Sequence, residues 1–218
     1  MQNTRALPDA MNDFDARQYA PATLRNREPI LEVLLEVLPP TGTVLEVSSG
    51  TGEHAVFFAP RIYPRRWLPS DPNPVARASI MAWRESAPEV ENLYPTIALD
   101  ACDPIWTVEQ QSLDIVAIVN INMIHIAPWA ACLGLLAGAK RILPPSGILY
   151  LYGPFKQRGQ HTAASNAAFD ASLRAQNPAW GVRNLEDVVE VAKTEGLALV
   201  ETVAMPANNL SVIFKKLS

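Results

Sequence analysis

The sequence contains little cysteine, no excess of basic residues and no long apolar run. Two cysteines among 218 residues, Cys102 and Cys132, are too few for a disulfide framework and have no metal-ligand partner at useful spacing, which favours a reducing compartment. No apolar run reaches the ~18 residues of a membrane helix; the longest candidate, residues 115–126, is interrupted by two asparagines and a histidine. Residues 1–15 are polar and acidic, unlike a secretory signal. We therefore expect a cytoplasmic protein without a membrane partner.

The charge balance is slightly acidic, with 18 Lys and Arg against 22 Asp and Glu and a net charge of −4. Proteins that grip nucleic acid usually present a basic surface, because neutralising phosphates supplies much of their affinity. The charge balance therefore favours a small-molecule or protein substrate and no nucleic-acid partner. It does not indicate an oligomeric state.

The length and the hydrophobic fraction of 49% suit one well-filled α/β domain spanning residues 1–218. Residues 1–20 predict an irregular N-terminal arm. A helix is expected over about 27–38, with Pro29 in its first turn and Pro39-Pro40 ending it.

Beyond residue 40, short β-rich runs alternate with helical stretches. Strands are predicted over 43–47, 66–69, 94–99, 113–119, 148–152, 197–204 and 210–215, and helices over 51–59, 74–86, 128–143, 167–175 and 185–195. Such alternation predicts right-handed crossovers, whereas the last connection is too short for one, so the last strand must run antiparallel. We expect an α/β fold: a Rossmann-like, doubly wound, seven-stranded sheet, mostly parallel with an antiparallel last strand, and helices on both faces.

The sharpest motif is the run from Val44 to Gly52, in which a strand leads through an acidic residue and a small-residue turn into a helix. Glycines in such a turn let the backbone approach a ligand closely. A carboxylate at Glu46 is unfavourable beside a pyrophosphate and favourable beside a cationic amino group, so the motif indicates S-adenosyl-L-methionine rather than NAD. Serine replaces the usual first glycine at Ser48, and a tight turn that binds nothing is the alternative. The predicted cofactor-binding residues here are Glu46, Ser48, Ser49, Gly50, Thr51 and Gly52.

Two further acids follow the second and third predicted strands. Asp71 can accept hydrogen bonds from both ribose hydroxyls, or it can cap the next helix. Asp100, with the N–H of Ala101, can bind the adenine end, or it can be a turn residue, and Asp103 is a rival for its role. Ligands of such sheets bind at the carboxyl ends of the strands, where these acids meet.

Several runs together resemble the methyltransferase-like protein 26 family. They are Arg25-Asn26-Arg27-Glu28-Pro29-Ile30, residues 120–129, Leu151-Tyr152-Gly153-Pro154-Phe155, residues 165–170, Trp180-Gly181-Val182-Arg183 and Met205-Pro206-Ala207-Asn208-Asn209. The likeness covers about residues 19–215. It implies a class I S-adenosylmethionine-dependent methyltransferase fold, to which the predicted sheet is also similar, and it implies no substrate.

The acceptor is expected beside the fourth and fifth predicted strands. The candidate catalytic residues are His125, Asn122 and Tyr152, with Asn120 as a further cofactor ligand. His125 is the natural general base for an oxygen or nitrogen acceptor, and simple packing is its alternative role. The polar segment 156–166 can be a lid. The Asn/Asp-Pro-Pro-aromatic motif of amino-directed nucleic-acid methyltransferases is missing after the fourth strand, which disfavours a base-flipping enzyme.

The leading hypothesis is therefore a small-molecule methyltransferase with S-adenosyl-L-methionine as donor and no metal. A cofactor-binding protein with weak or no catalysis is the alternative, motivated by Ser48 and by the lack of a clear acceptor motif. An NAD-dependent enzyme is a third hypothesis, which Glu46 disfavours.

Overall fold

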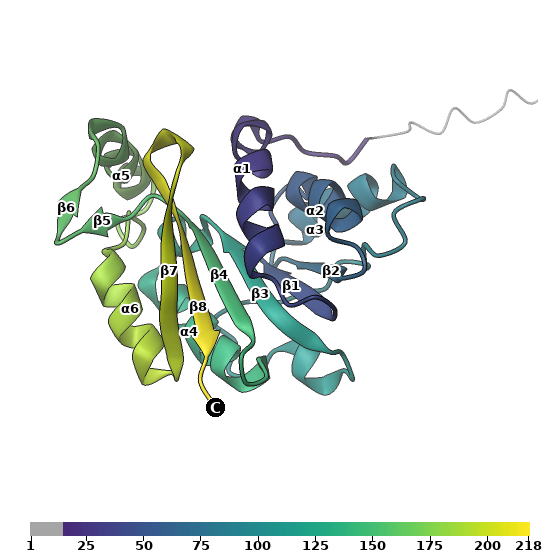
Figure 1. The fold of residues 1–218 in the computed structure, drawn as a ribbon. Coiled ribbons are helices and arrows are strands. Elements are labelled where there is room, and N and C mark those ends of the chain that lie inside the picture. Colours follow the sequence, from purple (N-terminus) through teal and green to yellow (C-terminus); the bar gives the residue numbers. More distant parts are fainter. Residues whose placement is uncertain (1–14) are drawn as a thin grey trace, which may run out of the picture.

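The computed structural model describes residues 15–218 (Figure 1). Of the predicted N-terminal arm, residues 15–20 are irregular as expected, and the remainder lies outside the described residues. Within the described part of the chain, no helix has the length and apolar character required to cross a bilayer.

The elements alternate along the chain much as predicted. The helices are α1 (Pro21–Val37), α2 (Glu53–Phe58), α3 (Pro74–Glu85), α4 (Trp129–Ile142), α5 (Ala164–Gln176) and α6 (Leu185–Thr194). The strands are β1 (Thr43–Val47), β2 (Arg66–Ser70), β3 (Ile115–Ile121), β4 (Ile148–Gly153), β5 (Lys156–Gln157), β6 (Gln160–His161), β7 (Leu197–Met205) and β8 (Asn209–Lys216). Four short 3₁₀ turns lie between them, at Ala59–Ile62, Thr107–Gln110, Met123–His125 and Pro206–Asn208.

The main sheet has the strand order β2-β1-β3-β4-β8-β7. Strands β1 to β4 pair in parallel, and β8 runs antiparallel to both of its neighbours, β4 and β7. The predicted antiparallel last strand and the mostly parallel sheet are thus confirmed. The carboxyl ends of β1, β3 and β4 lie at one edge, where a ligand site is expected.

The predicted third strand, residues 94–99, is not a strand in the structure, so the described part of the sheet has six strands rather than seven. This segment touches β2 only through isolated parallel bridges, Trp67 to Leu93 and Ser70 to Ile97. Pro69 in β2 and Pro95 in this segment both lack an N–H group, so neither can donate to a continuous ladder.

The first helix begins at Pro21, six residues earlier than predicted, so Pro29 lies inside it rather than in its first turn. Pro21 occupies the first helical position, where a missing N–H costs little. Both Pro21 and Pro29 could occupy the first turn of a helix, so the sequence alone does not show which of them begins α1.

Two apolar layers cover the sheet. On one face α1 and α2 pack over side chains such as Val44, Trp67 and Tyr150. On the other, α4 and α6 pack over Leu45 and Ile118, as Figure 1 shows for their positions. Helices on both faces are therefore confirmed, and they leave the strand ends free to build a site.

Candidate cofactor site

A cavity of about 630 Å³ lies at the carboxyl ends of β1 and β3 and beside the turn that follows β2. Five of the predicted cofactor-binding residues line it: Ser48, Gly50, Asp71, Asp100 and Ala101. The volume lies within the usual range for a small-molecule site. Residues that are distant in the sequence thus meet at one hollow, as the strand-end argument predicts.

The loop Ser48–Gly52 turns from β1 into α2 with three residues in left-handed backbone conformation. The φ angles are 59° at Ser48, 59° at Gly50 and 90° at Gly52. A Cβ at Gly52 would lie 2.8 Å from the Cα of Ile80, so glycine is required for the close approach of α3. Ser48 occupies a conformation that favours glycine, which explains why glycine is the usual residue there.

Two serines fasten the ends of β1 and β2 to each other. The Ser49 N–H donates to the Ser70 carbonyl at 2.8 Å, and the Ser70 N–H donates to Ser49 Oγ at 3.1 Å. The Ser70 hydroxyl donates to the Glu46 carbonyl at 2.7 Å. Ser49 is therefore buried below the loop, where it supports the backbone and does not face the cavity.

Asp71 faces the cavity from the end of β2 and is almost fully buried. Its Oδ2 accepts from the Gly50 N–H at 3.0 Å, and its Oδ1 accepts from the Asn73 N–H at 2.9 Å. The helix cap itself is Asn73, whose side chain accepts from Val75 N–H. Asp71 thus joins the cofactor loop to the turn before α3, and each oxygen keeps acceptor capacity for a ligand.

Asp100 and Ala101 form the opposite wall. Asp100 is exposed, and its Oδ1 accepts from the Cys102 N–H at 2.9 Å. Both residues line the cavity, whereas the rival Asp103 lines a separate groove beside α4 and α6.

Glu46 does not line the cavity. Its side chain is 1% exposed and its Oε2 accepts from Trp67 Nε1 at 3.0 Å, on the α1 side of the sheet. Burial raises the pKa of Glu46 to about 7, although the hydrogen bonds from Trp67 and Ser49 lower it. The carboxyl group of Glu46 is thus turned toward Trp67 and away from the cavity. It is not placed to select a cationic ligand, as the sequence had led us to expect.

Asn120 lies at the end of β3 and is 1% exposed. Its Nδ2 donates to the Val47 carbonyl at 2.9 Å, which ties β3 to the start of the cofactor loop. Its Oδ1 is buried and accepts from no group within residues 15–218. A buried acceptor without a donor is costly, which makes this oxygen a candidate ligand contact, although Asn120, like Glu46, does not line the cavity.

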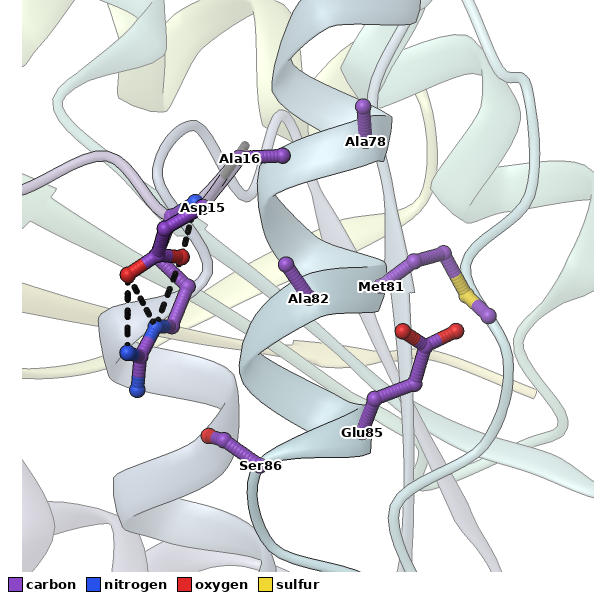
Figure 2. Close-up of a pocket in the computed structure, with 8 residues that line it drawn as sticks. Asp15, Ala16, Ala78, Met81, Ala82, Glu85 and Ser86 are labelled. Atoms are coloured by element: carbon purple, nitrogen blue, oxygen red, sulfur yellow. Dashed lines mark hydrogen bonds and ion pairs between the residues drawn. The ribbon is translucent and has the colours of Figure 1, made fainter. Parts of the chain in front are cut away.

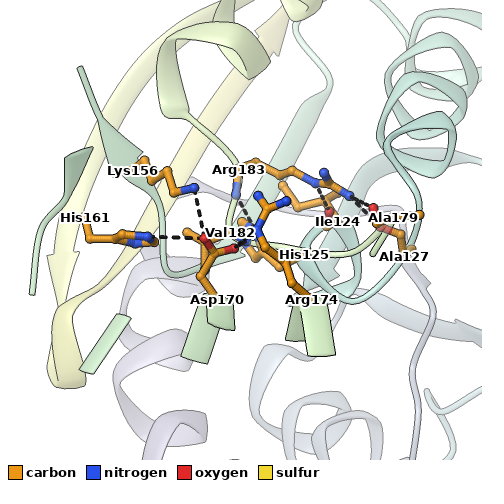
Figure 3. A network of polar contacts seen from close by, with 10 residues as sticks. All are labelled: Ile124, His125, Ala127, Lys156, His161, Asp170, Arg174, Ala179, Val182 and Arg183. Carbon is orange, nitrogen blue, oxygen red and sulfur yellow. Dashed lines mark hydrogen bonds and ion pairs between the residues drawn. The ribbon is translucent and has the colours of Figure 1, made fainter. Parts of the chain in front are cut away.

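His125 is fully buried next to the cavity but does not line it. Figure 3 shows its ring beside the segment 179–183, whose Arg183 N–H donates to Nδ1 at 3.2 Å. Burial, followed by the positive charge of Arg183, lowers the pKa of His125 to about 3. A Cβ on Gly153 would lie 2.6 Å from Nε2, so the ring is packed directly against the end of β4. This geometry favours the packing alternative over a general base.

The other two predicted catalytic residues, Asn122 and Tyr152, also lie outside the cavity lining. Asn122 has a φ of 65° at the turn after β3. Tyr152 is buried, and its hydroxyl accepts from Asn209 Nδ2 at 3.0 Å. Burial raises the pKa of Tyr152. The structure therefore brings Tyr152 and Asn209 together on the face of the sheet that α1 covers.

The predicted lid, residues 156–166, forms the β5–β6 hairpin and the start of α5. Asp170 holds the hairpin to α5, because its Oδ2 contacts Lys156 Nζ at 3.0 Å and His161 Nε2 at 3.2 Å (Figure 3). Its Oδ1 accepts from the Val182 N–H at 2.7 Å. The hairpin does not reach the cavity lining, so the structure presents it as a fastened element rather than a cover.

Sequence reasoning missed the apolar wall of the cavity, which consists of Pro72, Ile121, Met123, Ile126, Ala127, Pro128, Ala131 and Trp180. Most of these residues follow β3 in the run already singled out. Trp180 comes from the loop after α5, and its place in the run Trp180–Arg183 was the only available signal.

Other hollows lie outside this site. One of about 580 Å³ separates Asp15–Arg17 from α3, as Figure 2 shows. Within residues 15–218 there is no group of three or more His, Cys, Asp or Glu side chains arranged to hold a metal ion.

Comparison with known proteins gives one family and many similar folds. A family model described as a protein of unknown function (DUF938) matches residues 17–216. An O-methyltransferase family protein from Burkholderia thailandensis superposes with a TM-score of 0.74 at 15% identity, over 90% of this chain and 58% of that one. The S-adenosylmethionine-dependent methyltransferase SibL gives 0.70 at 19%, over 90% and 56%.

An O-methyltransferase family 2 protein from Planctomyces limnophilus, solved with apigenin, gives a TM-score of 0.68 at 18% identity, over 88% of this chain and 62% of that one. The chain thus spans between 56% and 62% of the length of these three structures. At such low identity the likeness shows the fold, which is the Rossmann-like methyltransferase fold.

Proposed function

The chain belongs to the DUF938 family of proteins of unknown function, and we propose that it is an S-adenosyl-L-methionine-dependent methyltransferase acting on a small molecule. The likeness to the methyltransferase-like protein 26 family is part of this proposal. The main support is the cavity at the strand ends, which is lined by Asp71, Asp100 and two residues of the loop, Ser48 and Gly50. Asn120, whose buried Oδ1 accepts from no group within residues 15–218, precedes the lining residue Ile121 but does not itself line the cavity.

The residues present fit the ribose, the adenine and the methionine moiety of S-adenosyl-L-methionine. Asp71 can accept from the ribose hydroxyls while it holds the Gly50 N–H. Asp100 and the Ala101 N–H suit the adenine edge, and Met123 and Ala131 supply an apolar surface for the base. The Asn120 Oδ1 can accept from the α-amino group of the methionine moiety, which would give this buried oxygen a donor.

When bound, S-adenosyl-L-methionine supplies an electrophilic methyl group on a sulfonium. The protein contributes alignment and the exclusion of water. Ser48, Gly50 and Asp71 would position the methyl donor, and the apolar wall with Trp180 would shield the reacting centre from water.

A cofactor-binding protein with weak or no catalysis is the second candidate function. It is favoured by one observation: His125, Asn122 and Tyr152, predicted as catalytic, all lie outside the cavity lining. An NAD-dependent enzyme is a weaker candidate, because the solved structures described above that share this fold are methyltransferases.

Calorimetric titration with S-adenosylhomocysteine tests the proposal, and a separate titration with NADH is the comparison. We expect saturable binding of S-adenosylhomocysteine and none of NADH at the same concentration. No binding of S-adenosylhomocysteine at millimolar concentration would refute the cofactor assignment. Transfer of label from methyl-labelled cofactor to a metabolite extract then separates the two candidates, since reproducible transfer rules out a non-catalytic protein.

A further inference from the structure

The N-terminal arm, residues 17–20, is fastened to the body by its own backbone. The Gln18 N–H donates to Ser79 Oγ on α3 at 2.7 Å, and the Ala20 N–H donates to Glu53 Oε2 on α2 at 2.5 Å. The Gln18 carbonyl accepts from Trp83 Nε1 at 3.0 Å. These bonds do not depend on which side chains the arm carries, so Ser79 and Glu53 act as receptors for an extended strand of backbone.

The same two side chains hold Thr51 of the cofactor loop. The Ser79 hydroxyl donates to the Thr51 carbonyl at 2.7 Å, and the Thr51 hydroxyl donates to Glu53 Oε2 at 3.0 Å. Thr51 follows directly after Gly50, which lines the cavity. Two separate connections therefore run from the arm to the loop, each through a single atom.

If the arm left, Ser79 and Glu53 would each lose a hydrogen-bond donor while still bonded to Thr51, and this loss costs free energy. Ser79 is fully buried, and its hydroxyl uses its one hydrogen on Thr51 while it accepts from Gln18. Glu53 is almost fully buried, and its carboxylate would lose a backbone donor if the arm left. Removing a donor from a buried carboxylate carries a desolvation penalty, so both groups would rearrange around Thr51.

Besides these bonds, the arm contacts α3 through two side chains at the surface: the Arg17 guanidinium lies over the Trp83 ring at 5.2 Å, and the Tyr19 ring meets the same ring edge-on at 5.1 Å. Figure 2 shows Asp15 and Ala16 facing Ala78 and Ala82 of α3 across an open hollow. Segments with few buried contacts open at low free energy compared with the core. The arm can therefore leave the surface while the rest of the fold stays intact.

We propose that Ser79 and Glu53 are positioning residues that couple docking of the arm to the shape of the cofactor loop, so that cofactor binding and arm docking strengthen each other. This inference rests on the proposed cofactor site. Coupling is reciprocal, so a ligand that fixes the loop must also hold the arm down by the same factor.

Amide hydrogen exchange of the full chain tests whether cofactor binding stabilises the docked arm. S-adenosylhomocysteine should slow exchange of the Gln18 and Ala20 amides, by roughly 5- to 150-fold for coupling of typical strength. The Gly159 amide is the internal control, because it is likewise held by one side-chain oxygen, Asn184 Oδ1 at 3.0 Å, but lies on the β5–β6 hairpin. Its exchange should not change.

The variant Ser79→Ala tests whether docking of the arm strengthens cofactor binding. It should speed exchange at Gln18 and weaken S-adenosylhomocysteine binding by a matching factor, whereas Ser172→Ala, a helix serine on α5, should leave both unchanged. If Ser79→Ala lowers the melting temperature strongly, Glu53→Met replaces it, because methionine keeps the length of the side chain and removes the oxygen that accepts from Ala20 and Thr51. Deleting residues 1–20 should weaken binding in the wild type and add little in Ser79→Ala, as expected for residues that act together.

The outcomes separate the two proposals. Binding of S-adenosylhomocysteine without slower exchange at Gln18 and Ala20, or unchanged affinity in both Ser79→Ala and Glu53→Met, overturns the coupling and leaves the cofactor site standing. Absence of binding in the wild type overturns the cofactor site, and the coupling is rejected with it.

Discussion

The backbone N–H of Arg183 donates a hydrogen bond to Nδ1 of His125 at 3.2 Å. A ring nitrogen that accepts cannot carry a proton, so neutral His125 must hold its hydrogen on Nε2. Turning the ring over would place a carbon opposite this N–H, so the bond also fixes the ring orientation. Because Nε2 carries the hydrogen, neutral His125 presents a donor and no basic nitrogen toward the end of β4.

Nitrogen NMR of histidine-labelled protein should therefore show His125 neutral between about pH 5 and pH 8, with Nε2 protonated. The reason is its burial and the Arg183 charge, which lower its pKa to about 3. The variant His125→Gln assigns the resonance by removing it. A protonated Nδ1, or titration of this ring near neutral pH, would restore the general-base hypothesis.

The carboxylate of Asp71 should matter for cofactor affinity. Asp71→Ala removes charge-assisted hydrogen bonds to ribose, which should weaken S-adenosylhomocysteine binding by about 1.5–3 kcal/mol in calorimetry. Asp103→Ala is the matched control, because this acid lies on the same side of the sheet but does not line the cavity. Equal affinities for wild type and Asp71→Ala would mean that Asp71 only supports the turn before α3.

Replacing Ser48 by glycine should stabilise the fold. Ser48 has a φ of 59°, a conformation that costs a side-chain-bearing residue more than it costs glycine. After the greater entropy of glycine in the unfolded chain is subtracted, we expect a gain of about 0.5–1 kcal/mol in urea unfolding. Ser49→Gly should instead destabilise, since it removes the hydroxyl that accepts from Ser70 N–H. The same sign for both variants would contradict this account of the loop.

Glu46 should make stability fall as the pH rises. Its folded pKa is about 7 and its reference value is 4.5, so the folded protein keeps a proton that the unfolded chain releases. The corresponding stability is present below about pH 4.5 and is lost as the pH rises through 7, on the order of 3 kcal/mol in all. Unfolding free energies of the wild type and Glu46→Gln should therefore diverge over this range. Parallel pH profiles would show that Glu46 is ionised when folded.

Much of the fold follows from the sequence because strand position and strand order are set by local patterns. The apolar runs at 43–47 and 148–152 appear as β1 and β4 almost residue for residue. The acids that close the second and third predicted strands, Asp71 and Asp100, both line the cavity, because the carboxyl ends of parallel strands share one edge.

The direction of individual side chains could not be predicted in the same way. Glu46 and Ser48 are two residues apart, yet one is turned toward Trp67 and the other faces the cavity, because the left-handed backbone at Ser48 breaks the strand alternation. After β3 the 3₁₀ turn Met123–His125 directs Met123 into the cavity and His125 away from it. A turn of three residues leaves no periodicity from which to read this difference.

The prolines at the outer side of the sheet, Pro69 in β2 and Pro95 in the segment beside it, have a consequence for the pairing of one molecule with another. An open sheet edge offers rows of N–H and C=O groups on which another chain can add a strand, and such pairing leads to aggregation. Here Pro69 lies in the last strand on that side and Pro95 in the segment beyond it, which makes only isolated bridges. A second molecule would meet an interrupted row of N–H donors there. The two prolines therefore disfavour the addition of a strand from another chain to this side of the sheet.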